Sequence, residues 1–507
     1  MSARTIMVQG TASSVGKSLL VTALCRYFRR EGLRVAPFKA QNMALNSAVT
    51  PDGFEIGRAQ AVQADAAGVL ACVDMNPVLL KPEGDQRSQV VVLGKPLASL
   101  SASEYHAYKP HLCSVIAGSL ARLRARHDLI VIEGAGSPAE INLKDRDIVN
   151  MHVARVAEAP VLLAGDIDRG GVFAALVGTL ELLEPDERAR IAAFVINKFR
   201  GDRALLAPGL DMLTARTGKP VLGVLPYLPR LRIADEDSVS LEHRVRRARG
   251  HADDIDIVVV RLPRISNHDD VEPLEHEPGV TVRFAERVEE LAGADLVILP
   301  GSKNTASDLT WLRATGLADA IVARARAGQP VLGICGGCQM LGERIEDPLG
   351  IESPQPVTAG LGLLPLHTRF APEKITARVG ARVLSASFLA PEGLSDLAGY
   401  EIHMGMLAAA EPCPAPFQIR QRSGRTVDVR DGAIGCAGAV VGTMLHGLFE
   451  NDALRGHMLD ALRSRRGLPA PSGAGAIAGK QSEYDRLEAA LRDNIDRGLL
   501  LSIVDLA

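Results

Sequence analysis

Cys335 is the residue whose surroundings point most directly to chemistry. In residues 331–340, VLGICGGCQM, an apolar run leads into this cysteine, which is followed by two glycines. A strand-to-helix turn this tight needs residues without a Cβ, and it places the sulfur at a helix N-terminus, which favours thiolate over thiol. We therefore predict that Cys335 is a nucleophile. A buried inert cysteine and a redox or metal pair with Cys338 are the alternatives, although no other CxxC spacing exists among the seven cysteines.

A second chemical signal lies near the start of the chain, in MVQGTASSVGKSLL at residues 7–20. In a glycine-rich loop between a strand and a helix, backbone N–H groups point at phosphate oxygens, the lysine neutralises the outer phosphates and the serine ligates Mg²⁺. We predict that Gly10, Thr11, Gly16, Lys17 and Ser18 bind ATP. The glycines are one residue further apart than in the commonest form of the motif. A glycine-rich turn that only caps a helix is the alternative.

A carboxylate from a neighbouring strand should complete a metal site beside this loop. Glu133 ends the apolar run LIVIE and precedes small residues that let a ligand approach, so Ser18 and Glu133 are the predicted Mg²⁺ ligands. A surface glutamate at a strand end is the alternative. Asn197 and Lys198 end another strand-like run, where they either face the nucleotide base or are ordinary polar residues at a strand terminus.

The composition is that of an ordinary water-soluble protein, with 47% apolar and 4% aromatic residues. The formal net charge of −3 gives no reason to expect a nucleic acid or an anionic membrane as a partner. Seven cysteines, an odd number in 507 residues, suit a reducing compartment better than a disulfide framework. The chain starts with a strand pattern rather than a signal peptide, and no apolar run reaches membrane-spanning length. We therefore expect a cytoplasmic protein without a membrane partner.

The elements that must position these residues form two successive α/β series. Strand patterns alternate with helical patterns such as Lys17 to Arg30, Ala59 to Gly68 and Val172 to Leu183, which predicts parallel sheets covered by helices on both faces. The predicted strands of the first series are residues 5–8, 34–38, 129–132, 160–164, 192–196 and 221–225. Those of the second series are residues 255–262, 294–301, 330–335 and 439–447.

A charged stretch without apolar periodicity separates the two series. We predict a P-loop domain at residues 1–230, a charged linker at 231–254, a second α/β domain at 255–455 and a C-terminal tail at 456–507. The tail should contain one amphipathic helix from Ser482 to Gly498, after a stretch of small residues. The predicted fold class is α/β, with a doubly wound parallel sheet in the P-loop domain.

Several longer motifs resemble the cobyric acid synthase family, the glutamine-hydrolysing amide synthases of cobalamin biosynthesis. They follow the family's order over nearly the whole chain: PFKAQNMALNS (37–47), FEIGRAQAVQADA (54–66), EGAGSPAEINL (133–143), DIDRGGVFA (166–174), PGSKNT (300–305), GICGGCQMLG (333–342), GYEIHMG (399–405) and LHGLFEND (445–452). The resemblance implies an ATP-using domain similar to dethiobiotin synthetase, joined to a glutamine amidotransferase domain of the triad type. The implied reaction uses ATP, Mg²⁺ and glutamine to amidate the b, d, e and g carboxylates of a corrinoid, adenosylcobyrinic acid a,c-diamide.

In the second domain the resemblance also implies the base that serves Cys335. His446 lies in the family's Leu-His-Gly motif, whereas spacing alone is equally compatible with a structural histidine at a strand end. Many relatives carry a glutamate two residues after this histidine, but the position is Leu448 here, so we expect a Cys-His dyad. Glu450 is a candidate to orient the ring instead. His403, the other histidine that the family pattern marks, is expected to contact substrate or to be structural.

The chemistry implied for Cys335 is attack on the glutamine amide carbon, which gives an oxyanion, releases ammonia and leaves a thioester. We expect backbone N–H groups to stabilise the oxyanion, one from Gly336 and another from the Gly301–Ser302 turn. Loss of one such donor costs about 2.7–4 kcal/mol in well-studied hydrolases, so these turns matter as much as side chains.

One loop departs from the family pattern. Residues 265–274, ISNHDDVEPL, resemble the loop after the first strand of the amidotransferase domain, but His268 and Asp269 stand where the family more often has an aromatic residue and a threonine. No catalytic role is implied for this loop.

Two other functions remain compatible with the sequence. One is the sister enzyme that amidates the a and c side chains, and the other is a P-loop switch ATPase whose second domain only binds a partner. The expected small-molecule partners are glutamine and a corrinoid, with ATP and Mg²⁺ as co-substrate and ion. Because the corrin brings its own cobalt, we expect no transition metal held by the protein. The oligomeric state is left open.

Overall fold

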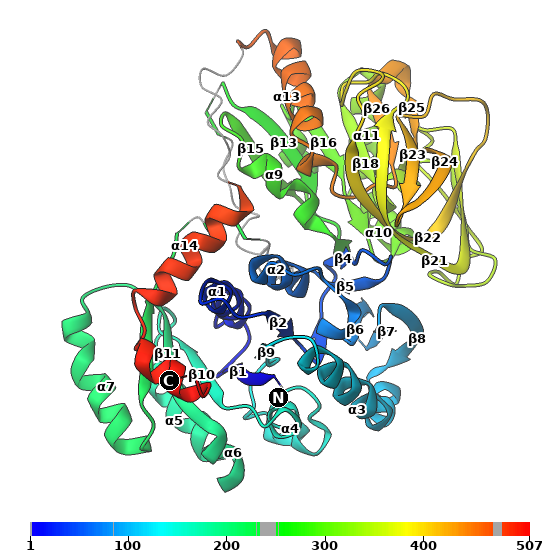
Figure 1. Ribbon diagram of the computed structural model, residues 1–507. Coiled ribbons are helices and arrows are strands. Elements are labelled where there is room, and N and C mark those ends of the chain that lie inside the picture. The colour runs from blue at the N-terminus through cyan, green and yellow to red at the C-terminus, as the bar shows by residue number, and fades with distance from the viewer. Residues whose placement is uncertain are drawn as a thin grey trace.

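The structure, a computed structural model, describes residues 3–84, 86–229, 231–233, 250–251, 253–469 and 479–506. These residues form two lobes (Figure 1). The first lobe contains the chain up to residue 226 and the C-terminal helices, and the second contains residues 255–466. The predicted linker lies mostly outside the described residues, as does the small-residue stretch that precedes the last helices.

A six-stranded parallel sheet in the order β12-β11-β10-β1-β9-β2 forms the centre of the first lobe. Its strands are β1 (Arg4–Gly10), β2 (Val35–Phe38), β9 (Leu129–Glu133), β10 (Val161–Asp166), β11 (Ile191–Phe199) and β12 (Val221–Pro226). The helices of this lobe's α/β series are α1 (Lys17–Arg30), α2 (Arg58–Ala67), α3 (Ala102–Arg124), α4 (Met151–Ala157), α5 (Val172–Leu182), α6 (Pro185–Arg190) and α7 (Arg203–Thr217).

Helices cover both faces of this sheet because its strands are apolar on both sides. Ile6 and Val8 of β1 pack in a core with α1, whereas Met7 between them packs in a second core with α3, α4 and α5. This alternation follows from the period-two direction of side chains along a strand. The predicted doubly wound parallel sheet is confirmed.

Smaller sheets that the sequence reasoning did not predict extend the first lobe toward the second. One has the order β3-β6-β7-β8, and a two-stranded ribbon joins β4 to β5. These strands are β3 (Gln41–Met43), β4 (Ser47–Val49), β5 (Glu55–Gly57), β6 (Val78–Gly84), β7 (Arg87–Val92) and β8 (Lys95–Ser101). The strands of the ribbon have three residues each, too few for a clear alternating pattern.

The second lobe has its own six-stranded sheet in the order β15-β13-β16-β18-β26-β25, parallel except for its last strand. Its strands are β13 (Ile255–Val260), β15 (Val280–Ala285), β16 (Leu296–Leu299), β18 (Val331–Ile334), β25 (Ala433–Gly435) and β26 (Val440–Thr443). A short ribbon pairs β14 (Ile265–Ser266) with β17 (Gly301–Ser302). The helices are α9 (Glu272–Glu275), α10 (Thr305–Ala314), α11 (Leu317–Arg326), α12 (Gly336–Leu341) and α13 (Asp452–Arg466). A second open sheet was predicted with four of these strands, but β15 and β25 were not predicted.

A large, mostly antiparallel sheet interrupts the second α/β series between α12 and β25, which the sequence reasoning did not predict. Its strands are β19 (Arg344–Glu346), β20 (Val357–Ala359), β21 (Leu366–Val383), β22 (Leu397–Ala409), β23 (Phe417–Arg422) and β24 (Arg425–Asp431). The pairing of β21 with β22 is irregular between Phe370 and Ile375, so a single alternating pattern does not run along the whole strand.

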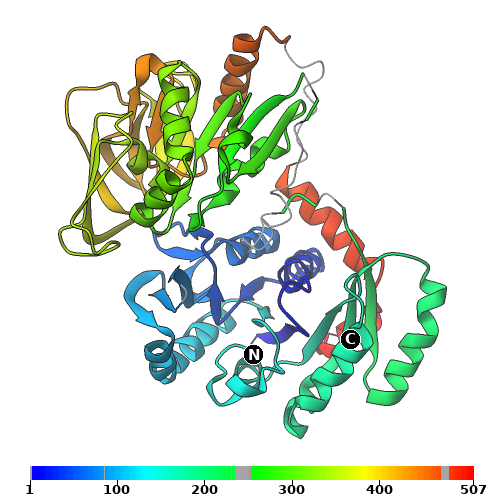
Figure 2. The same cartoon turned by 180° about the vertical axis from the view of Figure 1, so that it is seen from behind.

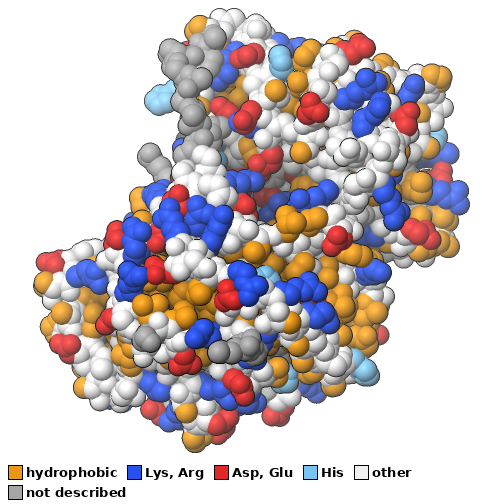
Figure 3. All heavy atoms as spheres, in the orientation of Figure 1, with side chains coloured by type: hydrophobic (Ala, Val, Ile, Leu, Met, Phe, Trp, Pro, Cys, Tyr) orange, Lys and Arg blue, Asp and Glu red, His pale blue; other side chains and the backbone are white. Residues whose placement is uncertain are grey.

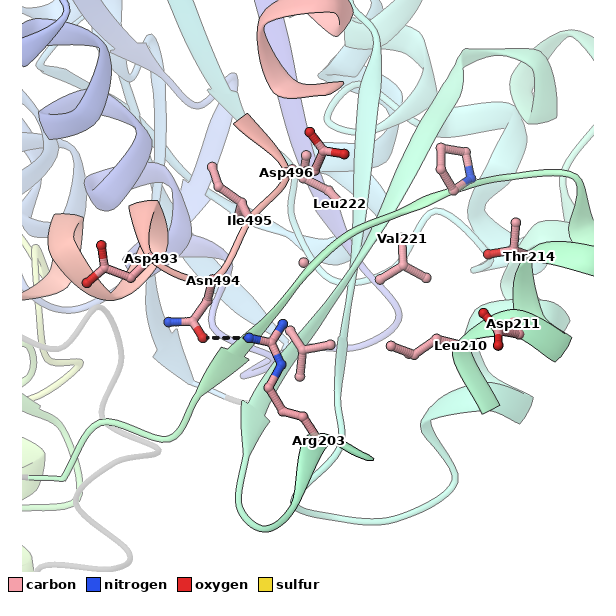
Figure 4. A pocket seen from close by; sticks show the side chains of 13 residues that line it. Arg203, Leu210, Asp211, Thr214, Val221, Leu222, Asp493, Asn494, Ile495 and Asp496 are labelled. Atoms are coloured by element: carbon pink, nitrogen blue, oxygen red, sulfur yellow. Dashed lines mark hydrogen bonds between the residues drawn. The ribbon is translucent and has the colours of Figure 1, made fainter. Parts of the chain in front are cut away.

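The C-terminal segment packs against the first lobe as two helices, α14 (Lys480–Arg492) and α15 (Arg497–Ile503), and the prediction of one helix was therefore wrong. Between them Ile495 pairs with Gly223 of β12. A Cβ on Gly223 would lie 2.3 Å from the carbonyl oxygen of Asn494, so the chain crosses the strand at close range. Figure 4 shows Arg203 of α7 pointing toward Asn494, whose Oδ1 accepts a hydrogen bond from it at 3.0 Å.

Buried polar contacts join the two lobes around β4 and β5, and Figure 2 shows this junction from behind. Glu55 lies between Lys81 of the first lobe, at 2.7 Å, and Lys374 of the second, at 2.5 Å. Burial would raise the pKa of Glu55, but the two ammonium groups outweigh burial and lower it below its usual value. The backbone N–H of Ser47 also donates to Asn267 of the second lobe at 3.1 Å.

Positive and negative side chains are interspersed over the face in Figure 3, as a net charge of −3 leads one to expect. Within the part of the chain that the structure describes, no helix has both the length and the apolar character needed to cross a bilayer.

Candidate active sites

The phosphate loop lies between β1 and α1, and packing requires its glycines. Gly16 has a φ of 96°, a conformation that residues with a Cβ rarely adopt, and a Cβ there would lie 2.3 Å from Nδ2 of Asn197. A Cβ on Gly10 would lie 2.5 Å from Cγ2 of Val15. Neither position therefore accepts a side chain without distorting the loop.

Polar residues at the ends of neighbouring strands hold the loop in place. Asn197 Nδ2 donates to the carbonyl of Val15 at 2.8 Å, and Lys198 Nζ donates to that of Ser14 at 2.7 Å. The Thr11 N–H donates to a carbonyl of β10 at 3.0 Å. Asn197 and Lys198 thus bind the loop's own backbone, a role that differs from the base contact considered for them.

Ser18 and Glu133, the two predicted metal ligands, meet beside the loop. Ser18 Oγ donates to Oε1 of Glu133 at 2.8 Å, and Lys39 Nζ forms an ion pair with the same oxygen at 2.8 Å. Gln63 Nε2 donates to the other carboxylate oxygen at 2.5 Å. Glu133 is 1% exposed, so these partners compensate a carboxylate that has lost its water. Lys17 lies next to them, with Nζ bonded to two loop carbonyls at 2.9 and 3.0 Å.

The donor atoms at this point suit Mg²⁺. A serine hydroxyl and one carboxylate are hard oxygen ligands, and Mg²⁺ commonly takes only one or two carboxylates because nucleotide phosphates and water complete its shell. Among the residues that the structure describes, no group of three or more His, Cys, Asp or Glu side chains could hold a metal ion. Ser18 and Glu133 therefore fit an ion that arrives with ATP.

The phosphate loop opens into a cavity of about 1500 Å³. Gly16, Lys17 and Ser18 line it, together with residues of the turn at Ile141–Arg146 and of β3. Single drug-sized ligands typically occupy about 300–1,000 Å³. The cavity therefore has room for ATP and for part of a second, larger substrate.

Cys335 lies in the second lobe, in the turn between β18 and α12. Its φ of 51° and ψ of −109° are unusual for a residue with a side chain. A Cβ on Gly336 would lie 2.8 Å from the backbone N of Ser302, and one on Gly337 would lie 2.0 Å from the carbonyl oxygen of Leu299. As predicted, the turn needs residues without a Cβ, and its glycines let it lie directly against the neighbouring strand. Cys335 as a whole residue is 6% exposed.

His446 is the partner of Cys335, and an aspartate holds its other side. The ring Nδ1 lies 2.6 Å from Oδ2 of Asp270, whose Oδ1 accepts the Gly447 N–H at 2.8 Å. Burial disfavours the imidazolium, but the Asp270 carboxylate and the Cys335 sulfur outweigh it and raise the pKa of His446 to about 10. The arrangement favours the imidazolium form of His446, with the ring fixed by a carboxylate.

The structure does not support the expectation of a Cys-His dyad, because Asp270 lies against His446 where the third member of a triad would lie. Glu450, the candidate considered from sequence, accepts a hydrogen bond from Lys480 at 2.7 Å, whereas the ring Nδ1 of His446 is bonded to Asp270. Asp270 belongs to the loop for which no catalytic role was expected. Leu448, two residues after the histidine, is buried among apolar side chains.

The residues predicted for the oxyanion hole lie beside the triad. The β14–β17 ribbon brings Gly301 and Ser302 next to the loop that carries Asp270. A Cβ on Gly301 would lie 3.1 Å from Cε1 of His446, and Gly336 faces Ser302 as described above. Three backbone N–H groups are thus near the nucleophile, and their role as oxyanion donors stays a prediction.

The other two singled-out side chains have structural surroundings. Nδ1 of His403 lies 2.7 Å from the carbonyl oxygen of Gly405, and Nε2 lies 3.4 Å from Glu401, which Arg422 also binds. Cys338 is fully buried behind the nucleophile, where a Cβ on Gly442 of β26 would lie 2.7 Å from its sulfur. Cys338 therefore packs against the sheet, as expected.

Comparisons with known proteins agree with this division of the molecule. A CobQ/CobB/MinD/ParA nucleotide binding domain matches residues 6–241, and a CobB/CobQ-like glutamine amidotransferase domain matches residues 256–454. A cobyric acid synthase from Sorangium cellulosum is 66% identical over the whole of this chain and 99% of its own length. The chain belongs to the cobyric acid synthase family. Another member of this family, from Moorella thermoacetica, is 52% identical over 99% of this chain and 98% of its own length.

Membership of the cobyric acid synthase family decides between the classes of function considered above. The family consists of glutamine-hydrolysing ligases with an ATP-binding and an amidotransferase domain, so the interpretation as a switch ATPase is not supported. The proposed α/β fold class, with a P-loop domain and a glutamine amidotransferase domain, is likewise confirmed.

Asp270 is the functional residue that sequence reasoning missed, since it is separated from His446 by 176 positions. One signal was available. The loop that carries Asp270 follows β13. The carboxyl end of β13 lies at the same edge of the parallel sheet as the carboxyl end of β18, which Cys335 directly follows. Ligands and catalytic groups gather at this edge in open α/β sheets.

Replacing Asp270 with asparagine should lower the rate of glutamine hydrolysis by up to about 10⁴-fold, because an amide cannot stabilise the imidazolium. Loss of the carboxylate should also bring the pKa of His446 down from about 10 toward its ordinary 6.5. The imidazolium that accompanies the thiolate would then be lost at lower pH than in the wild type. The pH dependence of glutamate release and of iodoacetamide alkylation at Cys335 measures both effects.

Glu450→Gln is the matched control for Asp270→Asn. It removes a carboxylate that is bonded to Lys480 and not to the His446 ring, and it should lower the rate far less than Asp270→Asn does. Equal loss in both variants would contradict the assignment of Asp270.

Proposed function

We propose that this chain amidates the b, d, e and g carboxylates of adenosylcobyrinic acid a,c-diamide, giving adenosylcobyric acid. The proposal is supported by its cobyric acid synthase relatives and by one structural observation, a phosphate loop and a Cys-His-Asp triad in two lobes joined by buried contacts. Hydroxide is a poor leaving group, and ammonia is mostly protonated at neutral pH. Both the carboxylate and the nitrogen therefore need activation.

Glutamine hydrolysis begins at Cys335. Its thiolate attacks the amide carbon of glutamine, and backbone N–H groups at Gly301–Ser302 and Gly336 stabilise the oxyanion. His446 gives its proton to the departing ammonia, and it then accepts a proton from the water that cleaves the thioester to glutamate. Asp270 remains charged throughout and stabilises the imidazolium.

The carboxylate is activated in the first lobe. One of its oxygens attacks the γ-phosphorus of ATP, which gives an acyl phosphate and ADP, while Lys17 stabilises the charge on the transferring group. Ser18 and Glu133 would hold Mg²⁺, which would supply positive charge to neutralise the phosphates. Ammonia from the second lobe then attacks the acyl carbon and expels inorganic phosphate. The cobalt enters and leaves as part of the corrinoid.

Mass spectrometry of the products tests the proposal. With ATP, glutamine and adenosylcobyrinic acid a,c-diamide, we expect successive carboxylate-to-carboxamide conversions that stop after the fourth. Each conversion should consume one ATP and one glutamine. Inactivity toward the diamide, together with amidation of cobyrinic acid at only two positions, would identify the a,c-diamide synthase instead.

A further inference from the structure

Arg58, the first residue of α2, crosses from the first lobe into the environment of the triad. Its Nη2 donates to the hydroxyl of Tyr400 at 2.6 Å and forms an ion pair with Oδ2 of Asp269 at 2.7 Å. The side chains of Arg58 and Asp269 are only 18% and 9% exposed. A charged contact between two lobes that is this well shielded from water is strong and directional.

Tyr400 connects Arg58 to the catalytic histidine. Its ring stacks on that of His446 with centroids 5.1 Å apart and an angle of 14° between the planes. The two residues also form a backbone bridge, with Tyr400 N donating to His446 O at 3.1 Å and His446 N donating to Tyr400 O at 2.9 Å. The position of Tyr400 therefore sets both the backbone and the ring plane of His446.

Asp269 places a second contact of Arg58 directly beside the triad carboxylate, Asp270. Burial raises the pKa of Asp269. The Arg58 guanidinium lowers this pKa, and the negative charge of Asp270 raises it further. Asp269 is thus a second carboxylate shielded from water, next in sequence to Asp270. Arg58 supplies the positive charge that lets two adjacent carboxylates share the site.

We propose that Arg58 is a positioning residue for His446, supplied to the glutaminase lobe by the ATP-using lobe. It acts through Tyr400 on the face of the imidazole and through Asp269 on the loop that carries Asp270. The inference rests on the triad of the proposed function, and it adds that this triad is incomplete without the other lobe.

The physical consequence of losing Arg58 is a misplaced histidine. Tyr400 would lose its charged hydrogen-bond partner and could shift. The Asp269 carboxylate would remain buried without its cation, so it would shift or take up a proton. Displacement of a catalytic group by about 1 Å can cost about 10²-fold in rate. Glutamine binding involves other groups, so the loss should fall on kcat rather than on KM.

Arg58→Met in the full chain tests the proposal, because methionine keeps the apolar stem and removes the guanidinium. We expect kcat for glutamine hydrolysis to fall about 10²-fold with KM changed less than about threefold. Synthesis from ATP and ammonium salts should keep its wild-type rate. Alkylation of Cys335 by iodoacetamide, followed on the peptide that contains it, should slow in parallel with kcat.

Arg26→Met is the matched control. Arg26 lies on α1, its side chain is 11% exposed, and it binds Asp485 at 2.6 Å and Gln481 at 2.9 Å, both on the C-terminal helix α14. It should hydrolyse glutamine at the wild-type rate. A kcat of Arg58→Met within about threefold of the wild-type value would overturn the proposal. An equal loss of glutamine-dependent and ammonia-dependent synthesis would also overturn it, because a purely structural role of Arg58 predicts that result.

Two further variants keep the test decisive if Arg58→Met does not fold. Tyr400→Phe removes only the hydroxyl and should lower kcat in the same direction, and Arg58→Lys should restore part of the activity through its charge at Asp269. Wild-type rates in Tyr400→Phe together with Arg58→Lys would overturn the proposal. The Cys335→Ser variant distinguishes a failure of the Arg58 proposal from a failure of the proposed function. If glutamine hydrolysis survives in Cys335→Ser, the triad itself is refuted, whatever the result for Arg58.

Discussion

Replacing Cys335 with serine is expected to abolish glutamine-dependent synthesis, with glutamine hydrolysis reduced by at least about 10⁴-fold. Serine is nearly isosteric, but its hydroxyl does not ionise at the pH where a thiol beside an imidazolium does. His446 and Asp270 would remain in place without a nucleophile to serve. Glutamate release from purified protein, measured with and without ATP, gives the loss directly.

The same Cys335→Ser chain should still make product from ammonium salts, because the phosphate loop lies in the other lobe. Cys338→Ser is the control, and it also tests the alternative that Cys335 and Cys338 form a redox or metal pair. If the two cysteines formed a redox or metal pair, both substitutions would inactivate the protein equally. We expect Cys338→Ser to cost stability, about 1–3 kcal/mol for a buried hydroxyl without a partner, and to retain glutamine hydrolysis.

Replacing Lys17 with methionine is expected to give the opposite pattern. Synthesis should fall about 10²–10³-fold with glutamine and with ammonium salts alike, because the charge on the transferring phosphoryl group loses its cation. Glutamine hydrolysis without ATP should persist, since Lys17 lies in the phosphate loop of the first lobe and donates there to the carbonyls of Ala12 and Gly136. Phosphate release and product formation under both nitrogen sources measure this effect.

Lys95→Met is a suitable control for the Lys17 variant. Lys95 belongs to the same lobe and lies over the ring of Phe54 at 5.4 Å, away from the phosphate loop. Wild-type synthesis in Lys17→Met, or equal loss in Lys95→Met, would refute the assignment. Together, Cys335→Ser and Lys17→Met should divide the reaction into two halves that can be lost independently.

Local sequence was sufficient for the elements and turns that carry the two main reactive groups. The apolar run of a strand and the periodicity of a helix are each contained in a short segment, so the six strands of the first parallel sheet, four strands of the second and α1 were predicted with nearly their observed bounds. The glycines around Cys335 and before Lys17 reflect a steric demand of the turn itself. For the same reason the nucleophile and the phosphate loop could be proposed before any contact was known.

The antiparallel strands between α12 and β25 and the break between α14 and α15 depended on longer-range packing. Irregular register along β21 blurs its alternating pattern, and the C-terminal helix is broken where the chain crosses β12. Asp493, Asn494 and Asp496 are weak helix formers, and Asp496 caps the helix that follows by accepting from the Leu499 N–H at 2.9 Å.

Only the tertiary structure decided which side chains complete the glutaminase site. Asp270 meets His446 across 176 positions, and Arg58 meets Tyr400 across 342. Neither residue has a local pattern that distinguishes it from an ordinary charged residue in a loop or at the start of a helix. The sequence by itself determined the nucleophile, the phosphate loop and the two sheets that carry them, because those depend on steric and periodic rules within one segment. The packing of the lobes decided the carboxylate and the arginine that orient the histidine, because their partners come from distant parts of the chain.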